Sequence, residues 1–343
     1  MATPLTLESF NDRTTYSAHF MDPVFWQPYV RQVCQWNSLT CLEITPGLPG
    51  TYPTFIVELD PTGFPKPFGS LVRTVVVKFF GPPFGGTACF RIELALGGLL
   101  ADLSLPIPSP AILASGQLTS AWSYLIFEHV RGLSIGQVSD QLSSDGWQTV
   151  ACQMGEYLHC LHTLTPGHLP DLPPAIQPGW DGFASFLSSQ RASCLAHHRA
   201  WDDLPAHLLG QLEDFVLPVE QLVDFSAPPH LVHADLTADH LLGRLESGRW
   251  QTSAIIDWGD AMTGNLLYEL VALLVDLFHS DIRLLHLCLE AYGLPGFFRH
   301  GFPRKVLSMV LLHQFPMPRS FYAPHQDAKT LSELAERLFT ERP

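Results

Sequence analysis

Two polar segments, each entered from a run of apolar residues, set the strongest limits on how this chain can fold. The first spans residues 231–243 and carries His233, Asp235 and His240 between apolar pairs. The second follows another apolar run and begins with Asp257. A Ser-Gly turn signal lies between the two segments, so the residues around it can pair as a hairpin. We therefore expect carboxylates and imidazoles to cluster at the ends of buried strands.

Such a cluster has the composition that phosphoryl transfer from a nucleotide requires. One carboxylate must orient and deprotonate the attacking hydroxyl, and further ligands must hold the metal ion that neutralises the phosphates. The spacing of His233, Asp235 and His240 matches the H-x-D-x-x-x-x-N catalytic loop of protein kinases, with His240 in place of the asparagine. Residues 233–240 are called the catalytic loop below.

The second segment reads IDWGDAMTGNLLYELVAL and resembles the aminoglycoside phosphotransferase family. Members of that family continue I-D-W into a small-residue turn, a glycine and an acidic amphipathic helix, and Gly264 and Glu269 stand in those places. The histidine at position 240 is similar to the one that macrolide phosphotransferases carry there. The resemblance covers residues 40–290.

This resemblance implies an α+β, two-lobed, protein-kinase-like fold. The N-terminal lobe, residues 1–127, would contain an antiparallel sheet and bind the nucleotide. The C-terminal lobe, residues 128–343, would be mostly helical and carry catalysis and substrate binding. A chain of 343 residues is long enough to form two such lobes.

The resemblance also implies a role for each polar residue of the two segments. Asp235 would orient and deprotonate the acceptor hydroxyl, and His233 would brace the catalytic loop. His240 and Asp257 would hold Mg²⁺, with Mn²⁺ as the alternative because an imidazole is a softer ligand than a carboxamide. Asp260 would support the metal site or contact the substrate.

A lysine interrupts the apolar, β-branched strand expected over residues 71–80. Because a lysine on a buried strand needs a partner, Lys78 is a candidate ion-pair residue. The resemblance makes it the phosphate-contacting lysine, and it nominates Glu93, on a helix expected over 87–97, as the partner. The alternative is an edge-strand lysine that reaches into water.

The connection between the strands expected at 40–45 and 54–59 is rich in glycine and proline. Gly47 and Gly50 would let backbone amides approach an anion. In a kinase-like lobe this connection, which includes Thr51, covers the nucleotide phosphates. An ordinary hairpin turn explains the same residues.

A further strand, expected over residues 122–132, turns polar and ends at a glycine. The resemblance makes its end the hinge between the lobes. There, backbone groups of Glu128 and Val130 would hydrogen-bond the purine of ATP or GTP.

Residues 165–229 begin with several prolines and continue with helices expected at 181–197 and 204–224. In the resembling family such helices line the acceptor pocket, although a solvated helix face explains the same polar residues. The candidates for substrate contact are Asp181, His197, His198, Trp201, Asp202 and Asp203, together with Asp260.

The overall composition argues against several classes of protein. The chain has 33 acidic and 19 basic side chains, a net charge of −14, and no basic cluster for a nucleic acid. Seven cysteines without C-x-x-C spacing predict neither a disulfide framework nor a zinc site. The N-terminus lacks a secretory pattern, and acidic residues interrupt the longest apolar runs. We expect a cytoplasmic protein with no membrane partner, and its oligomeric state stays open.

The sequence therefore predicts a small-molecule kinase that moves the γ-phosphate of ATP or GTP to a hydroxyl of a glycosylated natural product or antibiotic. A macrolide fits His240, and the acidic residues of 165–225 keep a cationic aminoglycoside open. Two alternatives remain. One is a metabolite kinase for a sugar or an amino alcohol, and the other is a catalytically silent pseudokinase, favoured by the prolines near Gly47 and by His240.

Overall fold

The chain divides into two units in this structure, a computed structural model that describes residues 5–60, 73–101, 103, 105–164, 172–294 and 301–340. The first unit contains the described residues up to 132, except 105–107, together with 253–259. The second contains 105–107, 133–252 and the described residues from 260 onward. The first unit thus extends past the expected boundary at 127, because its last strand reaches Glu128 and the chain later returns to it.

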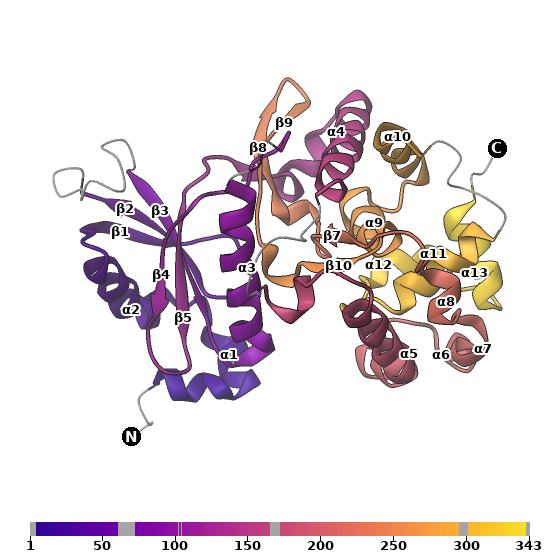
Figure 1. The fold of residues 1–343 in the computed structure, drawn as a ribbon, viewed down its shortest axis with the longest axis horizontal. Helices are drawn as coiled ribbons and strands as arrows, with labels where there is room; N and C mark the ends of the chain where they lie inside the picture. The colour runs from indigo at the N-terminus through magenta and orange to yellow at the C-terminus, as the bar shows by residue number, and fades with distance from the viewer. Residues whose placement is uncertain are drawn as a thin grey trace. The chain divides into compact units, whose positions relative to one another are not determined.

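The first unit is built on a five-stranded antiparallel sheet in the order β1-β2-β3-β5-β4, with β3 at the centre (Figure 1). Positions 71 and 72 of the strand expected over 71–80 lie outside the described residues. The strands are β1 (Cys41–Pro46), β2 (Thr54–Leu59), β3 (Thr74–Phe80), β4 (Ile112–Gln117) and β5 (Ser123–Glu128).

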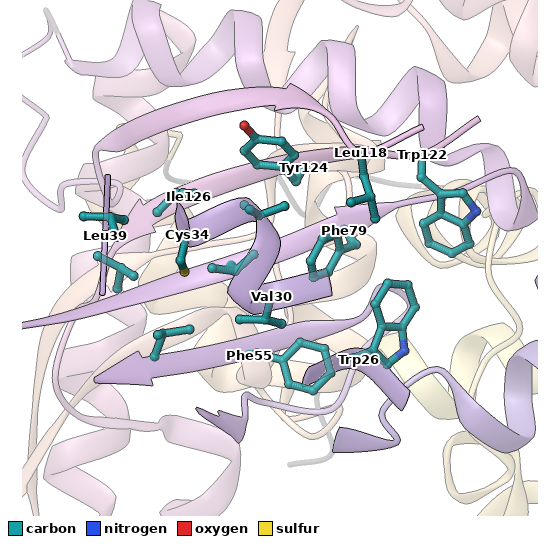
Figure 2. Packing of buried hydrophobic residues seen from close by; sticks show 14 of the residues in the cluster. Trp26, Val30, Cys34, Leu39, Phe55, Phe79, Leu118, Trp122, Tyr124 and Ile126 are labelled. Atoms are coloured by element: carbon teal, nitrogen blue, oxygen red, sulfur yellow. The ribbon is translucent and has the colours of Figure 1, made fainter. Parts of the chain in front are cut away.

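One face of this sheet packs against helix α2 (Pro23–Trp36). Successive side chains of a strand point to opposite faces, so β3 directs Val77 and Phe79 toward α2 and Lys78 toward the other face. The Trp26 ring stacks on the Phe79 ring with centroids 4.9 Å apart, and both are labelled in the cluster of Figure 2. This apolar face fixes the position of β3 and therefore of Lys78.

An aspartate followed by a proline at positions 22 and 23 predicts the start of a helix, and α2 begins there. The Asp22 side chain accepts hydrogen bonds from the N–H groups of Val24 and Phe25, and Pro23 occupies the first helical position. Helices η1 (Leu7–Asn11) and α1 (Arg13–His19) precede it.

The other face of the sheet packs against helix α3 (Gly86–Ala101), which extends beyond the expected range of 87–97 at both ends. Residues Pro83–Ala101 are long and apolar enough to cross a membrane by length and composition alone, a test that core helices of globular proteins also pass. Near the middle of α3 the buried side chain of Glu93 points toward β3, where it meets Lys78.

Two small sheets position the catalytic loop in the second unit. Strand β7 (His230–Val232) pairs antiparallel with β10 (Met262–Gly264), with Val232 opposite Met262. The catalytic loop therefore leaves β7 beside the point where Asp260 and Ala261 lead into β10.

The predicted hairpin after the catalytic loop is confirmed. Strands β8 (Leu241–Glu246) and β9 (Arg249–Ile255) are joined by Ser247 and Gly248, both with left-handed φ angles of 52° and 75°. Strand β6 (Leu133–Ser134) completes the sheet.

Helices make up most of the rest of the second unit, and one expected helix is wrong. Residues 204–224 form three short helices because Pro205 and Pro218 precede two of them and Gly210 ends the first. The helices are η5 (Ile135–Gln141), α4 (Ser144–His162), η6 (Pro174–Ile176), α5 (Asp181–Trp201), α6 (Ala206–Leu209), α7 (Leu212–Phe215), α8 (Val219–Leu222), α9 (Leu266–Ala272), a π-helical turn (Leu273–Leu277), α10 (Ile282–Tyr292), α11 (Phe302–Leu311), α12 (Arg319–Tyr322) and α13 (Leu331–Phe339). Pro166 and Pro170, in the proline-rich connection that precedes α5, lie outside the described residues.

Candidate active site

A buried ion triad lies in the first unit. Lys78 Nζ donates to Glu93 Oε2 at 2.9 Å and to Asp257 Oδ1 at 2.7 Å. The predicted pair of Lys78 and Glu93 is confirmed, and the edge-strand alternative is wrong because β3 is the central strand. Asp257 as a second partner of the lysine was not expected from the sequence.

The triad keeps the lysine charged. Burial by itself lowers the pKa of Lys78, but the charges of Asp257 and Glu93 and their hydrogen bonds raise it above its usual value. The Tyr52 and Phe80 ring centroids lie 5.6 and 5.1 Å from the ammonium. The Asp257 side chain is 27% exposed, so ligands can reach this end of the triad.

The glycine-rich connection between β1 and β2 closes as a hairpin. The Gly47 N–H donates to the Thr54 carbonyl at 2.8 Å, and the Tyr16 hydroxyl donates to the Thr51 carbonyl at 2.6 Å. Neither Gly47 nor Gly50 has a positive φ, so neither glycine adopts the left-handed backbone conformation that glycine favours. A role of the connection in binding phosphate stays a prediction.

One backbone group of the hinge expected at Glu128 and Val130 is already hydrogen-bonded within the first unit. The Glu128 N–H already donates to the Ala111 carbonyl at 2.9 Å, so it is not available to a purine. Val130 follows the end of β5 and is half-buried. At Glu128 a purine contact would therefore use the carbonyl oxygen, and contacts of Glu128 and Val130 with a nucleotide base stay a prediction.

In the second unit, the catalytic loop holds one imidazole in a defined tautomer. His240 Nδ1 hydrogen-bonds the carbonyl oxygen of Asp235, and a carbonyl can only accept. Nδ1 therefore carries a proton, and in the neutral ring the lone pair is on Nε2, the arrangement in which histidine binds a metal. His233 is fully buried, as expected of a residue that braces the loop, and the Asp235 side chain is 23% exposed.

Side chains that the sequence did not single out hold the rest of the loop. The Ala238 N–H donates to Asp276 Oδ1 at 2.7 Å, and the Ser134 hydroxyl donates to Asp239 Oδ1 at 3.1 Å. Asp276 comes from the π-helical turn and Ser134 from β6, so neither partner is near the loop in sequence. No local sequence pattern therefore predicts that Asp276 and Ser134 bond to the catalytic loop.

Glu269, which the family pattern placed on a helix, is buried on α9. Its Oε2 accepts the Ala234 N–H at 3.2 Å, so this acid supports the catalytic loop. Burial raises the pKa of Glu269 to about 7, against the opposing effect of its backbone hydrogen bonds.

Asp260 lies in the same part of the second unit as Asp235. Gln314 Nε2 donates to Asp260 Oδ1 at 3.3 Å, and the Gln314 N–H donates to the Tyr268 hydroxyl at 3.3 Å. Burial raises the pKa of Tyr268, and the negative charges of Asp260 and Asp235 add to the effect, so both carboxylates are near this ring. Two acids, Asp235 of the loop and Asp260, and the amide of Gln314 thus lie near one ring.

The remaining substrate candidates cannot all contact one small acceptor. Helix α5 has 21 residues, from Asp181 to Trp201, and is therefore about 30 Å long. Asp181 stands at its beginning, whereas Trp201 and Asp202 stand at its end. Only the beginning packs near Tyr268, through the ring of Phe183 at 5.6 Å. Trp201 and Asp202 therefore lie far from Asp181, and which end of α5 contacts the substrate stays a prediction.

His198 and Asp203 form a buried ion pair instead of a substrate contact. His198 Nδ1 donates to Asp203 Oδ1 at 2.9 Å, and Nε2 donates to the Leu311 carbonyl at 3.0 Å. Both partners only accept, so the imidazole carries both protons and is positively charged. The pair fastens the end of α5 to the end of α11.

We expect His198→Leu to lower the free energy of unfolding by about 3–5 kcal/mol, because it leaves the Asp203 carboxylate buried without its cation. Burial lowers the pKa of His198, but the Asp203 carboxylate raises it to about 10. Since the folded pKa exceeds the unfolded value of 6.5, the stabilisation is complete below pH 6.5 and is lost as the pH rises through 10.

Urea unfolding at several pH values between 6 and 10 would measure this effect, with His197→Leu on the same helix as the matched control. The difference in stability between wild type and His198→Leu should shrink toward pH 10. A difference that does not depend on pH would contradict the charged state assigned to His198.

The ligands present fit a metal bound together with nucleotide better than a metal bound by protein alone. Within the described parts of the chain, no group of three or more His, Cys, Asp or Glu side chains is arranged to hold a metal ion. Mg²⁺ in nucleotide sites typically takes one or two carboxylates and completes its shell with phosphates and water. Asp257 belongs to the first unit and His240 to the second, so their sharing of one metal stays a prediction.

The antiparallel sheet with its buried lysine, followed by a helical unit with an H-x-D loop, defines a phosphotransferase of the protein-kinase-like class. A model of the phosphotransferase enzyme family APH matches residues 69–302, more than half of the chain. The chain belongs to this family.

Solved and curated proteins are similar to this chain. The solved GDP and kanamycin complex of APH(2")-IIia is 17% identical, with a TM-score of 0.59 over 91% of this chain and 95% of that one, which shows the shared fold. Among curated proteins, hygromycin-B 4-O-kinase of Escherichia coli is 26% identical over 173 residues, 48% of this chain and 47% of that protein. Lysine-specific demethylase JMJ21 of Arabidopsis thaliana is 25% identical over 218 residues, 54% of this chain and 23% of that protein. The match thus spans less than half the length of either curated relative.

Proposed function

We propose that this protein is a small-molecule kinase that transfers the γ-phosphate of a nucleoside triphosphate to a hydroxyl of a glycosylated natural product or antibiotic. The observation that carries the proposal is the buried triad of Lys78, Glu93 and Asp257 in a chain of the APH family. Burying a lysine between two carboxylates is costly, and a protein that bound no phosphate would have little reason to retain it.

Each unit contributes a separate part of the chemistry. In the first unit, Lys78 binds the nucleotide phosphates, and Glu93 keeps the ammonium in place. A divalent ion bound with the nucleotide would neutralise charge on the phosphates, and Asp257 is the first-unit residue that would hold it. With Asp257 holding such an ion, Lys78 would keep its bond to Glu93 and contact the phosphates.

In the second unit, Asp235 acts on the acceptor. Its carboxylate orients the acceptor hydroxyl and takes up the proton as the oxygen forms a bond to the γ-phosphorus. The bond between this phosphorus and the bridging oxygen of the nucleotide breaks, and the nucleoside diphosphate leaves. His240, bonded to the Asp235 carbonyl, fixes the backbone from which the carboxylate projects.

The charge of the acceptor side supports a cationic glycosylated acceptor. Asp235 and Asp260 lie in the same part of the second unit, and the chain carries a net charge of −14. The relatives named with an acceptor point the same way, since one is a kinase for hygromycin B and another was solved with kanamycin. The seven cysteines are free, which supports a reducing compartment such as the cytoplasm.

A nucleotide-consumption assay tests the proposal. It combines ATP or GTP with Mg²⁺ or Mn²⁺ and a panel of aminoglycosides, macrolides, nucleoside antibiotics, simple sugars and amino alcohols. We expect turnover that requires one of the glycosylated antibiotics. Turnover with a simple sugar or amino alcohol alone would point to a metabolite kinase, and nucleotide binding without turnover on any acceptor would favour a pseudokinase.

A further inference from the structure

One residue of the catalytic loop has a backbone conformation that its side chain disfavours. Ala234, directly before Asp235, has a φ of +67°. An alanine at positive φ is strained, because its Cβ crowds the backbone and it has no polar side chain to compensate. Such a conformation persists only where the surroundings hold it.

Two buried side chains bond both backbone groups of this residue. Glu269 Oε2 accepts the Ala234 N–H at 3.2 Å, and His313 Nε2 lies 3.3 Å from the Ala234 carbonyl oxygen. Glu269 is 1% exposed and His313 is 3% exposed, so water does not compete for these bonds. The strained peptide is therefore held on both sides by side chains.

The hydrogen bonds of the His313 ring fix its tautomer. The Phe315 N–H donates to Nδ1 at 3.4 Å, so the proton is on Nε2, where it is donated to the Ala234 carbonyl. Burial lowers the pKa of His313 to about 4, so the ring is neutral at physiological pH. The ring also stacks on Tyr268, with centroids 4.8 Å apart. These contacts leave His313 little freedom to rotate away from the loop.

We propose that His313 is a positioning residue which, together with Glu269, holds Ala234 in its strained conformation and thereby sets the direction in which Asp235 projects. The inference rests on the proposed function insofar as Asp235 is the base. His313 lies beyond residues 69–302, where the family model matches, so family membership does not assign it this role. A displacement of a catalytic group by about 1 Å costs on the order of 10²-fold in rate.

The first test replaces the imidazole with an aromatic ring that cannot donate a hydrogen bond. His313→Phe retains an aromatic ring against Tyr268 but removes the donor to Ala234, and His313→Gln restores an N–H near the position of Nε2. We expect His313→Phe to lower kcat by roughly 10- to 100-fold with the KM for nucleotide nearly unchanged, and His313→Gln to recover part of the loss. The matched control is His207→Phe, since His207 Nε2 bonds the Ala328 carbonyl at 2.7 Å away from the loop, and its kcat should stay within about twofold.

A second substitution separates positioning from general stability. In an Ala234→Gly background the positive φ is no longer strained, because glycine adopts it freely. His313→Phe should then reduce kcat several-fold less than it does in the wild-type background. An equal loss in both backgrounds, or a His313→Phe protein with wild-type kcat, would overturn the proposal.

Hydrogen exchange provides a readout that needs no acceptor. We expect the amides of residues 233–236 to exchange faster in His313→Phe than in wild type, while those of α13 stay unchanged. If no acceptor is ever phosphorylated, the proposed function fails, but this measurement still tests whether His313 holds the backbone of Ala234 in place. Unchanged exchange in the catalytic loop would overturn the proposed role of His313, whatever the activity of the variant.

Discussion

Replacing Asp235 with asparagine should abolish acceptor phosphorylation and leave nucleotide binding intact. The substitution keeps the size of the side chain but removes the group that takes up the proton, and loss of a general base typically costs about 10²–10⁴-fold in rate. The hydrogen bond from His240 to Asp235 is to the carbonyl oxygen, which the substitution does not change, and the carboxylate lies farther from the ring, at 3.8 Å. The loop should therefore keep its conformation.

Steady-state turnover and nucleotide affinity by calorimetry would measure the two effects separately. Asp140→Asn, the same chemical change at an exposed position of the second unit, is the matched control and should behave as wild type. Turnover of the Asp235→Asn protein within tenfold of wild type would refute the role of Asp235 as the base.

Replacing Lys78 with methionine should have the second large effect, on both stability and nucleotide binding. The change removes the cation between Glu93 and Asp257, whose oxygens lie 2.9 and 2.7 Å from it. Leaving buried charge without its partner typically costs about 3–5 kcal/mol. Because the same ammonium is the proposed phosphate contact, nucleotide affinity should fall as well.

The double variant Lys78→Met with Glu93→Leu separates the two effects. Glu93 is the more buried of the two carboxylates, since Asp257 is 27% exposed and can be solvated. The double variant should therefore recover part of the stability in urea unfolding without recovering nucleotide affinity. Lys305→Met, at an exposed lysine, is the control. Wild-type nucleotide affinity in Lys78→Met would contradict the contact of Lys78 with phosphate. A double variant no more stable than the single one would contradict the claim that the buried Glu93 carboxylate, left without Lys78, causes the loss of stability.

Features encoded within a few residues could be predicted from the sequence. The capping of α2 by Asp22 and the turn at Ser247 and Gly248 depend on neighbours two to three positions away, and both are confirmed. The single helix expected over 204–224 was wrong. The apolar pattern of helical period continues through Pro205, Gly210 and Pro218, but these residues divide the segment into short helices.

The candidate site was predicted where a family motif covered it and was incomplete elsewhere. Lys78 and Glu93 were paired correctly through the resemblance, and the structure shows their bond. The contact of Lys78 with Asp257 joins residues 179 positions apart, and no local pattern specifies it. The substrate candidates of α5 were grouped by composition, which does not reveal that Asp181 and Trp201 lie at opposite ends of one helix.

The sequence by itself thus indicated the family and the residues of the two motifs, because both depend on short-range spacing. Only the tertiary structure decided which distant side chains meet. It made His198 a charged structural residue bonded to Asp203, and it brought His313 to the Ala234 carbonyl across 79 positions of chain. The physical reason is that a buried polar group needs a partner, but packing between distant elements selects which one it finds.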